Sequence, residues 1–149
     1  MAELSHYSDE QLANAAANAL ATALQGLIDA GKRPRLAIPG GSALAVLREA
    51  RMALGDDWSK VRLTWVDERC VNQDDADSNR GEAYRVGALD PASPCADELP
   101  LWLDGEHSSG ACERVERELK VRFDGAVDVC LLGMGPDGHI ASLFPGNEH

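Results

Sequence analysis

An aspartate and a histidine, Asp137 and His139, flank Gly138 in the segment LLGMGPDGHIASLFPG. An imidazole has a reference pKa of about 6.5, so it can accept and return a proton near neutral pH. A nearby carboxylate can fix the tautomer of the ring and stabilise its charged form. On local chemistry alone, the pair fits either an acid–base catalyst or a structural histidine held by a hydrogen bond.

The same segment carries the glycine pattern of a dinucleotide-binding loop, with glycines at 133, 135 and 138. That fingerprint requires a helix beginning at the third glycine and an acidic residue about 20 positions later. Pro145 interrupts the segment that would form the helix, and no such acid follows up to His149. We therefore interpret the glycines as the frame of a catalytic loop, in which Gly133 and Gly135 permit positive-φ backbone close to a ligand.

Two further loops carry groups suited to a phosphorylated ligand. The segment PGGS at 39–42 offers close backbone approach and the Ser42 hydroxyl, ahead of a predicted helix whose first N–H groups attract anions. Asp67, Glu68 and Arg69 follow a predicted strand, and an arginine can bind a phosphate through two parallel hydrogen bonds. An ordinary tight turn in the first case and an internal salt bridge in the second remain open alternatives.

Charge and composition narrow the class of partner. The chain has 149 residues, a formal net charge of −11 and 44% hydrophobic residues, as expected for one globular domain. An acidic protein is a poor match for nucleic acid or an anionic membrane, since both bind basic surfaces. There is no apolar run of the ~20 residues that a membrane span needs, and the polar start of the chain differs from a signal peptide, so we expect a cytoplasmic protein. The four cysteines form no C-x-x-C pair, and we predict no metal site.

The spacing of apolar residues predicts alternating helices and strands. A capping box at Ser8-x-x-Gln11 begins the first helix, and Gly31 ends it. The later helices are predicted to follow Ser42, to begin near Ser78 or Asn79, and to cover 108–123. The predicted strands cover 35–39, 60–66, 126–132 and, as a short edge strand, 99–103. The segment 126–132 is the most apolar of them, which predicts a place at the centre of a parallel sheet.

This alternation predicts a single α/β domain over residues 1–149, with a doubly wound, mostly parallel, Rossmann-like sheet flanked by helices. In such sheets ligands bind beyond the carboxyl ends of the strands. The loops at 39–42, 67–69 and 133–139 each follow a predicted strand. We therefore expect the three loops to form one site.

Taken together and in this order, the motifs GGS, VDERCV, DSN and LLGMGPDGHIASLFPG are more specific than any one of them. From about Leu36 onward the chain resembles the 6-phosphogluconolactonase family, within the glucosamine-6-phosphate isomerase/6-phosphogluconolactonase superfamily. The resemblance implies hydrolysis of 6-phospho-D-glucono-1,5-lactone to 6-phospho-D-gluconate, in the oxidative branch of the pentose phosphate pathway. It also implies that the reaction uses neither a metal nor a cofactor.

The resemblance assigns a role to each matching residue. His139 would be the general base that activates water, and Asp137 would orient His139 or hold a sugar hydroxyl. Asp67 would line the sugar site, and Arg69 would be the cationic partner of the phosphate. The remaining substrate- and phosphate-binding residues would be Gly40, Gly41, Ser42 and Gly135.

The chain also departs from the pattern of the family. Phe144 stands where the related amino-sugar phosphate isomerases carry a proton-transferring glutamate, which favours the lactonase over that alternative. Pro39 precedes the first loop and Ala43 follows it, so a threonine hydroxyl donor is missing there. Chains of the family usually continue well past SLFPG. We therefore expect the C-terminal part of the domain to be missing. The sheet edge exposed in this way would promote self-association. The alternative function is that of a non-catalytic sugar-phosphate-binding remnant of the fold.

Overall fold

The computed structural model describes residues 9–147, and within them four strands form a parallel sheet in the order β3-β2-β1-β4. The strands are β1 (Arg35–Ile38), β2 (Arg62–Trp65), β3 (Asp97–Leu99) and β4 (Val129–Cys130). The helices are α1 (Asp9–Asp29), α2 (Ala43–Leu54), α3 (Asn79–Arg85) and α4 (Ser108–Arg122), with a 3₁₀ helix η1 (Gly55–Lys60) ahead of β2. This arrangement confirms the predicted α/β class.

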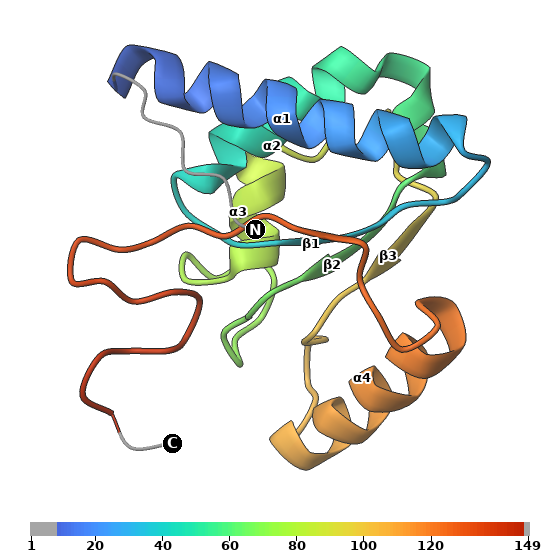
Figure 1. The fold of residues 1–149 in the computed structure, drawn as a ribbon. Coiled ribbons are helices and arrows are strands. Elements are labelled where there is room, and N and C mark those ends of the chain that lie inside the picture. Colours follow the sequence, from blue (N-terminus) through green and yellow to red (C-terminus); the bar gives the residue numbers. More distant parts are fainter. Residues whose placement is uncertain (1–8, 148–149) are drawn as a thin grey trace.

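Helices cover both faces of the sheet, as the doubly wound prediction requires. Figure 1 shows α1 and α2 packed together on one face, with α4 on the other side beside β3. The main core lies under α1 and α2, where Leu24, Ile38, Leu47 and Leu63 are fully buried. These apolar side chains fix the positions of β1 and β2, and so they fix the loops that leave the carboxyl ends of both strands.

The strand predicted at 126–132 for the centre of the sheet lies at an edge of the sheet that residues 9–147 form. Among the described residues β4 pairs with β1 alone, through Leu36–Val129 and Ala37–Cys130, and it lies at the edge of the sheet. Cys130 is exposed, and Leu132 is 52% exposed. An apolar run shows that a strand favours burial, but the neighbours of that strand are decided by the path of the whole chain.

The edge strand on the other side also differs from the prediction. β3 covers Asp97–Leu99, so it ends where the predicted strand at 99–103 begins. Arg62 pairs with Asp97, and the hydroxyl of Thr64 donates to the carbonyl of Leu99. Pro100 follows directly and has no N–H with which to continue the ladder.

The three predicted helix starts at Ser8, Ser42 and Ser78 have different outcomes. The Ser8 half of the capping box lies outside the described residues, although α1 does begin at Asp9. Ser42 occupies the N-cap position of α2 but forms no side-chain capping hydrogen bond. Ser78 caps α3 as expected, because its hydroxyl accepts the N–H of Gly81 at 2.9 Å.

None of the helices within residues 9–147 is long and apolar enough to cross a membrane.

Candidate functional site

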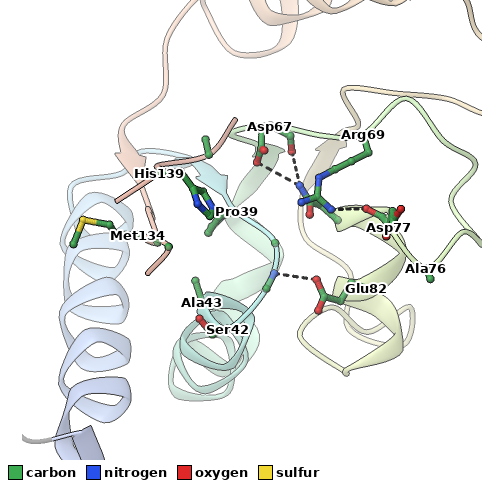
Figure 2. Close-up of a pocket in the computed structure, with 16 residues that line it drawn as sticks. Pro39, Ser42, Ala43, Asp67, Arg69, Ala76, Asp77, Glu82, Met134 and His139 are labelled. Carbon is green, nitrogen blue, oxygen red and sulfur yellow. Dashed lines mark hydrogen bonds between the residues drawn. The ribbon is translucent and has the colours of Figure 1, made fainter. Parts of the chain in front are cut away.

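The three loops predicted to share a site lie together beyond the carboxyl ends of β1, β2 and β4 (Figure 2). They line an open cavity of about 390 Å³. The parallel register explains this meeting, since Ile38 pairs with Trp65 and Ala37 pairs with Cys130, so the three strands end at the same edge. Each of the three loops contributes predicted site residues to the cavity wall, namely Gly40, Gly41, Ser42, Asp67, Arg69, Gly135 and His139.

His139 and Asp137 are in direct contact, with 2.5 Å between His139 Nδ1 and Asp137 Oδ1. The loop around them is a tight reversal. The N–H of Gly135 donates to the carbonyl of His139, and the N–H of Gly138 donates to the carbonyl of Gly135, both at 2.9 Å. Gly138 has a φ of +85°, a conformation that glycine adopts without strain. The contact between the acid and the imidazole, one of the two roles that the sequence left open for Asp137, is therefore present.

This contact determines which nitrogen of His139 can accept a proton. The hydrogen bond from His139 lowers the pKa of Asp137 below its ordinary value of 3.8, so the carboxylate is ionised at neutral pH. An ionised carboxylate only accepts hydrogen bonds, so Nδ1 of His139 must carry the proton. In the neutral ring Nε2 then holds the free lone pair. The His139 side chain is one-third exposed and lines the cavity, which places a proton acceptor at its wall.

The glycines of this loop act differently from the prediction. Neither Gly133 nor Gly135 has a positive φ, so that expectation was wrong. Gly135 is needed for space instead, because a Cβ there would lie 2.1 Å from Cε1 of His139. The positive φ values of this loop fall on Gly138 and on Ala141, whose φ is +52°.

An aromatic ring packs on the imidazole. The ring centroids of His139 and Phe144 are 4.9 Å apart and the planes are inclined at 34°. Phe144 therefore confines the imidazole on one side with an apolar surface, while Asp137 holds Nδ1 by a hydrogen bond.

The first loop is held between α2 and α3. Gly40 lies directly against Asn79, since a Cβ on Gly40 would lie 2.0 Å from the Oδ1 of that side chain. Gly41 has a φ of +68°, and its N–H donates to Oε2 of Glu82 at 2.9 Å (Figure 2). The loop is therefore more specifically packed than an ordinary tight turn, and its backbone already holds an acidic side chain.

The second loop does not form the internal salt bridge that the sequence left open. Among the described residues Arg69 makes no ion pair with Asp67 or Glu68, and its guanidinium donates to the carbonyl of Asp77 at 2.8 Å. Asp67 accepts from the Ser142 hydroxyl at 2.6 Å and from Asn79 Nδ2 at 3.3 Å. Asp67 thereby connects the end of β2 to the loop that carries His139.

Four residues of this region were missed or given no role by the sequence: Glu68, Asn79, Glu82 and Ser142. Glu68 accepts the N–H groups of Asn79 and Arg80, both at 2.8 Å, and so anchors the start of α3. The motifs DSN, VDERCV and LLGMGPDGHIASLFPG contain Asn79, Glu68 and Ser142, but the sequence offers no comparable signal for Glu82. Within residues 9–147 no group of three or more His, Cys, Asp or Glu side chains is arranged to hold a metal ion.

Comparison with known proteins places this geometry in a family. The sequence profile of the glucosamine-6-phosphate isomerases/6-phosphogluconolactonase family matches residues 7–149. The chain is 36% identical to a 6-phosphogluconolactonase of Caulobacter vibrioides, covering 94% of this chain and 59% of that protein. It is also 36% identical to a 6-phosphogluconolactonase of Mycobacterium leprae, covering 93% of this chain and 61% of that protein.

Solved structures agree with the sequence comparison. The crystal structure of a 6-phosphogluconolactonase from Shewanella baltica superposes with a TM-score of 0.76 at 30% identity, covering 94% of this chain and 59% of that one. A putative 6-phosphogluconolactonase from Neisseria gonorrhoeae gives a TM-score of 0.73 at 33% identity and similar coverage. The chain thus spans about 60% of the length of these relatives. It belongs to the glucosamine-6-phosphate isomerase/6-phosphogluconolactonase family.

Proposed function

We propose that the protein to which this chain belongs hydrolyses 6-phospho-D-glucono-1,5-lactone to 6-phospho-D-gluconate, in the oxidative branch of the pentose phosphate pathway. The relatives named above support this proposal, since each carries the name 6-phosphogluconolactonase. The observation that carries it is the hydrogen-bonded Asp137–His139 pair, whose imidazole lines the same cavity as the glycine loop and Arg69. A base and an anion-binding loop in one cavity suit a substrate with a reactive carbonyl and a phosphate.

His139 acts as the general base in the proposed reaction. Nε2 takes a proton from a water molecule while the water oxygen attacks the lactone carbonyl carbon. The tetrahedral intermediate then collapses, the bond between that carbon and the ring oxygen breaks, and the imidazolium returns the proton to the ring oxygen. One water is added across the ester, and His139 ends in its original state. A positioned acid–base group of this kind typically accelerates a reaction by about 10²–10⁴-fold.

The other loops hold the substrate in this proposal. The backbone of Gly40 and Gly41, the Ser42 hydroxyl and the Arg69 guanidinium bind the phosphate. Asp67 lines the sugar site next to the catalytic loop, to which it is joined through Ser142. Gly135 leaves room for the imidazole at the other end of the cavity.

Amino-sugar phosphate isomerisation is less well supported. That reaction moves protons at more than one carbon or oxygen and benefits from a second acid–base side chain near the first. The side chain packed on the His139 ring is Phe144, which has no proton to transfer. The packing therefore favours hydrolysis.

We further propose the cytoplasm as the compartment in which this reaction takes place. All four cysteines, at positions 70, 95, 112 and 130, are free thiols. Free thiols persist in reducing compartments, whereas oxidising compartments favour disulfides.

Lactone hydrolysis by the purified protein tests the proposal. Freshly generated 6-phosphogluconolactone is coupled to 6-phosphogluconate dehydrogenase, and the spontaneous rate is subtracted. We expect His139→Ala to lose about 10²-fold or more in kcat/KM. The matched control is His107→Ala, which removes an exposed imidazole at the start of α4 and should leave the rate unchanged. Equal rates for wild type and His139→Ala would overturn the catalytic assignment.

A further inference from the structure

An acidic side chain of the protein itself occupies the first loop. Glu82 on α3 points at the loop, and its Oε2 accepts the N–H of Gly41 at 2.9 Å (Figure 2). The proposed function assigns that N–H to the phosphate of the substrate. A carboxylate and a phosphate are both anions, so they compete for the same donor.

The charges around the cavity strengthen the competition between Glu82 and the phosphate. Among the described residues that line it, Arg69 is the one lysine or arginine, while Asp67, Asp77 and Glu82 are acidic. Asp67 accepts hydrogen bonds from Ser142 and Asn79, and within residues 9–147 it accepts none from the backbone of the first loop. Glu82 is the carboxylate in contact with the glycine backbone, and repulsion between it and a phosphate dianion falls directly on the phosphate end of the site.

The position of Glu82 is fixed by the elements around it. Glu68 holds the first N–H groups of α3, and Ser78 caps that helix. On the other side, Gly40 lies against Asn79, so the loop packs directly on α3. The Glu82 side chain therefore reaches Gly41 from a rigid base, and only its own torsions need to change for the carboxylate to leave.

We propose that Glu82 is a specificity-determining residue that competes with the substrate phosphate for the N–H of Gly41. The carboxylate occupies the N–H when the site is empty and moves away when a phosphate binds. It thereby lowers the affinity of the site for phosphate alone, including free inorganic phosphate, and favours ligands that gain further contacts at the His139 end. This inference rests on the proposed function, because it takes the first loop as the phosphate site.

The test is the binding of inorganic phosphate to the wild type, Glu82→Gln and Glu113→Gln. Glutamine keeps the length of the side chain and an oxygen that accepts the Gly41 N–H, but it removes the charge. Glu113 is exposed on α4 and forms no ion pair or side-chain hydrogen bond within residues 9–147, so its variant controls for the change in net charge. Binding is followed by the amide ¹H–¹⁵N resonance of Gly41, and we expect the Kd of Glu82→Gln to be about tenfold lower than that of the other two.

Each outcome separates this inference from the proposed function. Equal phosphate affinity in all three proteins, or weaker binding by Glu82→Gln, overturns the competition and leaves the phosphate site in place. Absence of any phosphate-dependent shift at Gly41 overturns both the competition and the assignment of the loop, while the His139 experiment still tests hydrolysis. Glu82→Ala provides a second variant, and it should bind phosphate more tightly than the wild type even though it has no acceptor for the Gly41 N–H.

Discussion

The imidazole of His139 lies directly over the backbone of Gly135, with no room for a side chain between them. A Cβ on Gly135 would come within 2.1 Å of Cε1 and 2.3 Å of Nδ1 of the ring. The ring is further confined by Phe144 and by the hydrogen bond to Asp137. The smallest residue at position 135 is therefore a condition for the observed orientation of the His139 imidazole.

Gly135→Ala should displace the imidazole and lower kcat/KM for the lactone by about 10²-fold, because a misplaced base loses most of its catalytic effect. The matched comparison is Gly133→Ala, where a Cβ would make ordinary contact with Ala43 at 3.9 Å. That variant should retain a rate close to that of the wild type. Similar losses in the two variants would show that the loop tolerates no added side chain, and the steric argument for Gly135 would fail.

Asp137→Asn should lower kcat/KM by about 10–100-fold. Replacing a buried aspartate that orients a catalytic histidine lowers kcat by about 10⁴-fold. The Asp137 side chain is 57% exposed, so water can partly replace its hydrogen bond to His139, and we expect a smaller loss. An asparagine can also present its N–H₂ to Nδ1 and favour the wrong tautomer. Steady-state kinetics of this variant beside Asp74→Asn, which removes a carboxylate from the exposed loop after β2, measures the effect. An Asp137→Asn rate equal to that of Asp74→Asn would exclude an orienting role.

The hydrogen bond from Ser142 to Asp67 should be energetically coupled to catalysis, since it ties the loop of His139 to the end of β2. We expect Ser142→Ala to lower kcat several-fold, and to have little further effect once Asp67 is changed to Asn. A double-mutant cycle on kcat/KM should give a coupling energy of about 1 kcal/mol, as expected for a partly exposed hydrogen bond to a charged group. Strictly additive effects of the two substitutions would mean that the contact does not position the loop.

The ion pair between Arg35 and Asp128 should make stability depend on pH at the edge of the sheet. The hydrogen bond from Arg35 lowers the pKa of Asp128 from 3.8 to about 2, and the two side chains are only 18% and 17% exposed. Because the folded state has the lower pKa, this contribution is fully present above about pH 4 and is lost as the pH falls toward 2. It amounts to about 1–2 kcal/mol after allowance for solvent at the edge strand.

Urea unfolding of Asp128→Asn at several pH values checks this prediction. The variant should be less stable than the wild type by about 1–2 kcal/mol at pH 7, and the difference should shrink between pH 4 and pH 2. Asp124→Asn is the control, because Asp124 also faces Arg35, at 3.2 Å, but its side chain is 71% exposed. A difference that persists unchanged down to pH 2 would point to packing instead of charge.

The sequence by itself determined the local pieces of this protein. Apolar spacing predicted the helices that became α1, α2 and α4, and the motifs at 39–42, 67–69 and 133–139 were correctly expected to lie together at one edge of the sheet. The contact between Asp137 and His139 was also within reach of the sequence, because two residues on either side of a glycine meet within a single turn.

Only the tertiary structure decided the contacts between distant segments. It placed β4 at an edge, moved the other edge strand to Asp97–Leu99, and joined Ser142 to Asp67 across 75 positions. It also brought the Glu82 carboxylate to the N–H of Gly41 and the Arg69 guanidinium to the carbonyl of Asp77. Apolar periodicity records which face of a segment is buried. It carries no information on which segment lies opposite, since strand order and polar contacts depend on the conformations of the connecting loops and on hydrogen bonds formed after the core has packed.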